Sequence, residues 1–68
     1  MLANERIKYR RIKRDIGTQQ AAGQLMHPPV SQAKWSRWER GLSHPRKAER
    51  LQLAQILGGK PADYDGEI

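Results

Sequence analysis

The stretch that decides the fold is SQAKWSRWERG, residues 31–41. Ser31 is a preferred N-cap residue, because its hydroxyl accepts a hydrogen bond from the free backbone N–H groups of the next turn. Gly41 tolerates the left-handed conformation in which many helices end. Between them, Trp35 and Trp38 are three residues apart and therefore fall near one stripe of a helix. We expect a capped helix that packs on its two tryptophans.

The other directions of this helix hold amide, hydroxyl and cationic side chains. They are Gln32, Lys34, Ser36, Arg37 and Arg40. A glutamine amide can form two hydrogen bonds to the major-groove edge of adenine, and an arginine can do the same to guanine. The pattern is typical of a recognition helix in a DNA-binding module, over residues 31–40. Gln32 and Arg37 are its expected base contacts.

Length, composition and charge restrict the class of protein. Sixty-eight residues form one small domain with a thin core, and the absence of cysteine excludes disulfides and thiolate metal sites. The apolar runs are too short to span a membrane, so we expect a cytoplasmic protein without membrane partners. All 13 basic residues but only four of the seven acidic ones lie in residues 1–60. This imbalance favours a polyanionic partner, although a basic surface can also serve solubility alone.

The remaining sequence predicts three further helices, over residues 3–16, 19–26 and 46–57. In the first, Asn4 is the expected cap, and the apolar spacing of Tyr9, Ile12 and Ile16 marks the inner face, which Ile7 extends less regularly. The cationic side chains on the other faces include Arg10, Arg11 and Arg14, which are candidate phosphate contacts.

The second helix is expected to begin at a Thr18 cap, and the last to follow Pro45. The inner residues expected in these two helices are Ala21, Ala22 and Leu25, then Leu53, Ala54, Ile56 and Leu57, with Leu51 at the border. Residues 27–30 (HPPV) cannot continue a helix, because proline lacks the backbone N–H, and they form a stiff connector. We divide the chain into a DNA-binding domain, residues 1–59, and an acidic tail, residues 60–68, which we expect to be disordered.

Catalysis has little support in the sequence. The two histidines, His27 and His44, lie in proline-containing connectors, and no phosphate loop, zinc spacing or nucleophile elbow is present. We therefore expect no enzyme activity, no metal, no cofactor and no small-molecule substrate.

Three runs together resemble the lambda repressor/Cro superfamily. They are GTQQAAGQL at residues 17–25, SQAKWSRWERG at 31–41 and LQLAQILG at 51–58. The resemblance implies a compact all-α domain of four helices with a helix-turn-helix, which binds operator DNA as a dimer and regulates transcription. The G-T-Q opening at residues 17–19 is similar to that of some phage Cro and early activator proteins, so a phage or prophage regulator, such as a repressor, is expected. The connector after Leu25 is several residues longer than the tight turn of that family.

The resemblance also implies residue roles. Gln32, Ala33 and Arg37 match positions that face base edges, with Lys34 and Ser36 beside them. Thr18 or Gln19 matches a phosphate contact at the start of the preceding helix, and Arg40 is expected to contact phosphate as well. The partners implied are a double-stranded DNA operator and a second copy of the chain.

Two alternatives from other classes stay open at this point. A tryptophan pair on a basic surface could stack on exposed bases, which would make the protein an RNA- or single-strand-binding regulator. The basic surface could instead bind an acidic protein, as in an antitoxin or adaptor, with the tail as a docking segment. Base stacking requires exposed indole rings, whereas a role in the core requires buried ones. The exposure of Trp35 and Trp38 therefore distinguishes the first alternative from a role in the core.

Overall fold

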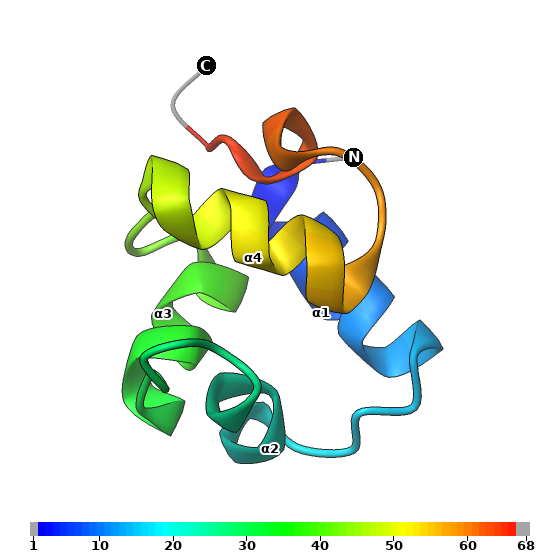
Figure 1. Ribbon diagram of the computed structural model, residues 1–68, viewed down its shortest axis with the longest axis vertical. Helices are drawn as coiled ribbons and strands as arrows, with labels where there is room; N and C mark the ends of the chain where they lie inside the picture. Colours follow the sequence, from blue (N-terminus) through cyan, green and yellow to red (C-terminus); the bar gives the residue numbers. More distant parts are fainter. Residues whose placement is uncertain (1, 67–68) are drawn as a thin grey trace.

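The computed structural model describes residues 2–66, and this part of the chain is all-helical, as expected. α4 lies across α1, while α2 and α3 occupy the other end of the molecule (Figure 1). The described residues form no strand. The elements in order are α1 (Ala3–Lys13), α2 (Gln19–Gln24), α3 (Gln32–Arg40), α4 (Lys47–Leu57) and a 3-10 turn η1 (Pro61–Tyr64).

The caps predicted for α2 and α3 are confirmed. The Thr18 hydroxyl accepts a hydrogen bond of 3.0 Å from the backbone N–H of Ala21. The Ser31 hydroxyl accepts one of 3.1 Å from the backbone N–H of Lys34. Gly41 ends α3 with φ of 76°, in the left-handed region that glycine adopts without a steric penalty. Local sequence thus fixes both ends of α3.

The core is built around the two tryptophans. Trp35 and Trp38 are 0% and 1% exposed, and their ring centroids lie 5.5 Å apart. The predicted inner face of α4 is confirmed, because Leu53 and Leu57 are buried and Leu51 is half exposed. The other buried core residues are Ile7, Ala22, Met26 and Tyr64.

The predicted inner face of the first helix is confirmed at Ile7 and wrong at Tyr9 and Ile12. Tyr9 and Ile12 are 51% and 59% exposed, whereas Ile7 and Arg11 are buried. The helix also ends at Lys13, ahead of the expected residue 16. The inner face follows an i, i+4 row that includes an arginine, so a pattern of apolar residues alone selects the wrong side.

A buried ion pair replaces the missing apolar contacts. The Arg11 Nε lies 2.6 Å from Glu39 Oε2, and the Trp35 indole N–H donates to the same oxygen over 2.7 Å. Gln19 Nε2 donates to Glu39 Oε1 over 3.0 Å, and Arg11 Nη1 donates to the carbonyl of Ile16. The hydrogen bonds from Arg11, Gln19 and Trp35 meet at Glu39 and join α1, α2 and α3. Among the described residues, no buried side-chain nitrogen or oxygen lacks a hydrogen-bond partner.

Asn4, the expected cap of the first helix, has another role. Leu2 occupies the N-cap position of α1, and Asn4 lies in the first turn. Its side-chain amide donates over 3.3 Å to the carbonyl of Glu39, at the end of α3. The carbonyls in the last turn of a helix lack partners within that helix, so Asn4 satisfies one of them.

The connector between α2 and α3 is folded onto the core. Helix α2 ends at Gln24, two residues before the predicted end. Leu25, expected inside, is 47% exposed, and the chain turns Met26 into the core instead. The His27 backbone N–H donates to Gln52 of α4 over 2.6 Å, and the Gln52 amide donates back to the His27 carbonyl over 2.7 Å. A side chain of α4 thereby holds the connector in place.

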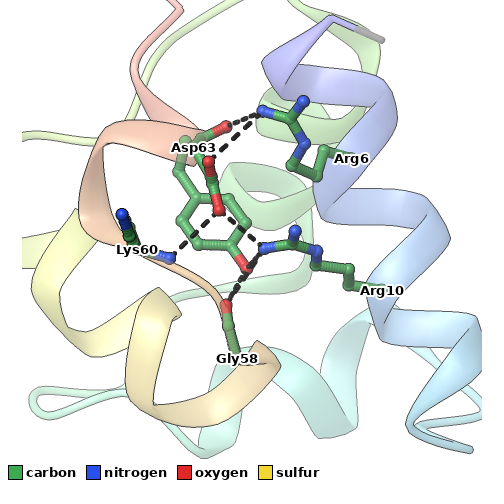
Figure 2. Close-up of polar contacts among 6 residues, drawn as sticks. Arg6, Arg10, Gly58, Lys60 and Asp63 are labelled. Atoms are coloured by element: carbon green, nitrogen blue, oxygen red, sulfur yellow. Dashed lines mark hydrogen bonds and ion pairs between the residues drawn. The ribbon is translucent and has the colours of Figure 1, made fainter.

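The expectation of a disordered tail is wrong for residues 60–66. Tyr64 is fully buried, and its hydroxyl donates to the carbonyl of Gly58. Arg10 donates to this hydroxyl over 2.9 Å and to Asp63 over 3.1 Å. Arg6, one turn earlier in α1, also contacts Asp63 (Figure 2). The tail closes the core against α1 and α4. The tail prediction for residues 67–68 lies outside the described residues.

Candidate nucleic-acid interface

The outward face of α3 is open to solvent. Trp35, Trp38 and Glu39 point into the molecule, and this leaves the polar directions of the helix free. Gln32, Ala33, Arg37 and Arg40 are exposed, and Ser36 is partly exposed. Four of the five expected base contacts therefore lie on an accessible face of a helix of about two and a half turns.

Lys34, the fifth expected base contact, is engaged elsewhere. Its ammonium lies 2.7 Å from Glu49 Oε2 at the start of α4 and 5.6 Å from the centroid of the Trp38 ring. Burial would raise the pKa of Glu49, but hydrogen bonds from the Arg46 backbone and from Lys34 hold it below its ordinary value. The ion pair joins α3 to α4 and draws Lys34 away from the outward face of α3.

Thr18 and Gln19, expected to contact phosphate from the start of α2, differ in their exposure to solvent. The Thr18 hydroxyl caps α2 as an acceptor and is exposed, so its proton remains available to a partner. Gln19 points inward, where its amide donates to Glu39. Only Thr18 has the accessibility that a phosphate contact requires.

The arginines expected to contact phosphate from the first helix do not gather beside the outward face of α3. The prediction of a phosphate contact by Arg11 is wrong, because its guanidinium is buried against Glu39. Arg10 donates to the Gly58 carbonyl, to Asp63 and to the Tyr64 hydroxyl, and the hydrogen bond to Tyr64 is the largest cause of its raised pKa. Arg14 is exposed, and its guanidinium lies beside Gly58. The C-terminal ends of α1 and α4 lie on the side of the molecule away from α3 (Figure 1).

Two cations that sequence reasoning missed lie at the start of α4. Arg46 and Lys47 are exposed, and the Lys34–Glu49 ion pair ties their turn to α3. Pro45 before them is buried and receives a hydrogen bond of 3.0 Å from Arg50 on its carbonyl. The signal in the sequence was a pair of basic residues directly after a proline at the start of a helix. The loop between α3 and α4 brings this pair close to α3.

Glu39 is the carboxylate on which the orientation of α3 depends. Burial would raise its pKa, but hydrogen bonds from Arg11, Gln19 and Trp35 outweigh this effect and lower the pKa below its ordinary value. An ionised Glu39 anchors the inner side of α3, so the outward residues keep a fixed direction. The outward face of α3 is therefore preorganised by buried contacts on the opposite side of the helix.

The described structure is that of a small all-helical domain in which one helix, α3, presents a polar and cationic face. The chain matches no family model, no curated protein and no solved structure. Among residues 2–66, no helix has the length and apolar content needed to cross a membrane. The same residues contain no group of three or more histidine, cysteine or acidic side chains that could hold a metal ion.

Proposed function

We propose that this protein is a sequence-specific regulator of transcription that binds double-stranded DNA, acting in the cytoplasm of a bacterial host. Helix α2, its connector and α3 form a helix-turn-helix in this proposal. α3 enters the major groove with its N-terminal turns toward the bases, and α2 lies across the backbone. The observation that carries it is the outward face of α3, which is rich in hydrogen-bond donors and rests on two buried tryptophans.

The proposed contacts follow from accessibility. Gln32 and Arg37 contact bases, with Ala33 and Ser36 next to them. Arg40, Thr18 and the cations Arg46 and Lys47 contact phosphates on either side of the groove. Phosphate contacts supply affinity without sequence information, whereas base contacts supply specificity.

The alternative of base stacking by tryptophan loses its physical basis. Stacking requires the face of an indole ring to be accessible to a base. Both indoles are at most 1% exposed, and the Trp35 N–H is bonded to Glu39. A single-stranded partner would have to be bound without them, so duplex DNA is the better-supported target.

A dimer on DNA is part of the proposal. One α3 of nine residues covers a short half-site, and two-fold pairing doubles the number of base contacts.

The test is selection of bound duplexes from a random pool, combined with the mass of the complex in solution. The proposal predicts an enriched, two-fold-symmetric sequence and a complex of two chains per duplex. Competition with oligo-dT and hairpin RNA is the control, and both should compete less well than the selected duplex. An unenriched pool, or stronger binding to either competitor, would contradict the proposal.

A further inference from the structure

An open hollow of about 480 Å³ lies between α2, the connector and the first turn of α3. It adjoins Gln32, the first proposed base contact. No ionised side chain lines it, although the chain is strongly basic. Its lining residues are Gln20, Gln24, Pro29, Val30, Ser31 and Gln32.

The hollow has one amide-rich wall and one apolar wall. Three glutamine side chains, from α2 and α3, supply the amides. Pro29, which is exposed, and Val30, which is partly buried against the core, supply the apolar surface. An amide group beside an apolar surface matches the major-groove edge of an A·T pair, where adenine offers N7 and N6 and thymine offers its C5 methyl group.

The apolar wall is held rigidly. The Val30 backbone N–H donates to the carbonyl of Gly23 over 3.0 Å. A Cβ at position 23 would collide with the Val30 carbonyl oxygen, so glycine allows this close approach of α2 and the connector. The paired hydrogen bonds between His27 and Gln52 fix the other end of the connector. Pro29 therefore has a set position relative to α3.

We propose that this hollow is a subsite for one A·T base pair of the bound duplex. The amide of Gln32 bonds the adenine edge, and the thymine methyl group packs on the ring of Pro29. The inference rests on the proposed function and deepens it, because it makes the connector a determinant of sequence preference. The absence of a lining cation argues against a phosphate at this position.

The experiment removes the methyl group from the DNA and the ring from the protein. Each thymine of a selected duplex is replaced in turn by deoxyuridine, and the dissociation constant is measured for the unsubstituted protein and for Pro29→Ala. One thymine should show a loss of about fourfold with the unsubstituted protein, as expected for one buried methyl group. The same replacement should have no effect on Pro29→Ala, and Gln32→Ala should relax the preference at that same base pair.

The control variant is Gln55→Ala, an exposed glutamine of α4 that does not line the hollow. It should keep the full deoxyuridine effect, and thermal unfolding checks that Pro29→Ala is folded. Specific binding in which no thymine depends on Pro29 would overturn the inference and leave the proposed function intact. Equal weakening by Pro29→Ala on selected and random duplexes would also overturn it. Absence of any sequence preference would remove the proposed function itself.

Discussion

Arg37 is the side chain on which sequence preference depends most. It is exposed on the outward face of α3, two residues beyond the buried Trp35. A guanidinium that bonds O6 and N7 of guanine discriminates between bases, whereas one that bonds phosphate does not. Its substitution therefore separates the two kinds of contact.

We expect Arg37→Ala to weaken binding to the selected duplex by about 1–3 kcal/mol and binding to random duplex much less. The matched control is Arg14→Ala, which removes an exposed arginine beside Gly58, away from α3. Titrations at one salt concentration measure both. Equal losses on the two duplexes would make Arg37 a phosphate contact.

Single residues also show where prediction from sequence succeeds. Ser31, Thr18 and Gly41 act through hydrogen bonds and backbone angles within one turn, so their roles follow from local chemistry. Arg11 and Glu39 are far apart in the chain, and their pairing inside the core is a tertiary event. No local pattern marks Arg11 as different from the other basic residues around it.

At the scale of elements, α1 and the tail are the parts that sequence reasoning described wrongly. The inner face of α1 could not be found from apolar residues, because Arg11 is part of it. The tail was expected to be loose because it is acidic and short, but Asp63 meets the arginines of α1 and Tyr64 fills the core. Asp63 supplies a charge match with α1, whose residues are distant in sequence.

The connector between α2 and α3 is held to α4 by hydrogen bonds between His27 and Gln52, and this contact can be tested by substitution. We expect Gln52→Ala to lower the free energy of unfolding by about 1–2 kcal/mol, because it leaves both backbone groups of His27 without their partners. Urea unfolding followed by tryptophan fluorescence measures this effect. Gln55→Ala, with an exposed side chain on the same helix, should change stability by less than about 0.5 kcal/mol. Equal effects of the two substitutions would show that the connector is not held by α4.

At the scale of the whole molecule, three acidic side chains serve the fold. Glu39 pairs with Arg11, Glu49 with Lys34, and Asp63 with Arg6 and Arg10. The pKa of Asp63 is lowered mainly by the Lys60 backbone N–H and then by Arg10. The charge imbalance could be predicted from composition, but its distribution could not, because it depends on which cations the fold neutralises.

These pairs make stability depend on pH. Glu39 and Glu49 have lowered pKa values in the folded state, so their contribution is fully present above the ordinary value of 4.5 and is lost as the pH falls through the folded values. We expect the free energy of unfolding to be constant from pH 7 to about pH 5 and to fall steeply below it. Urea unfolding across this range measures the profile.

Glu39→Gln is the informative variant for this profile. It leaves Arg11 buried beside a neutral amide, so it should be less stable than the unsubstituted protein at pH 7, and its stability should fall less between pH 5 and pH 3. Glu5→Gln, which replaces an exposed carboxylate at the start of α1, is the control and should keep the steep fall. An unchanged slope in Glu39→Gln would assign the acid sensitivity to other carboxylates.

The central claim is that the outward face of α3 lies on duplex DNA, and mapping of backbone amide chemical shifts by NMR tests it most directly. The isotope-labelled protein is titrated with a selected duplex and, separately, with a random one. We predict that the selected duplex produces its largest additional shifts in residues 31–40 and at the start of α4, with small changes at the end of α1. Additional shifts concentrated along α1 and η1, with α3 unaffected, would contradict the claim.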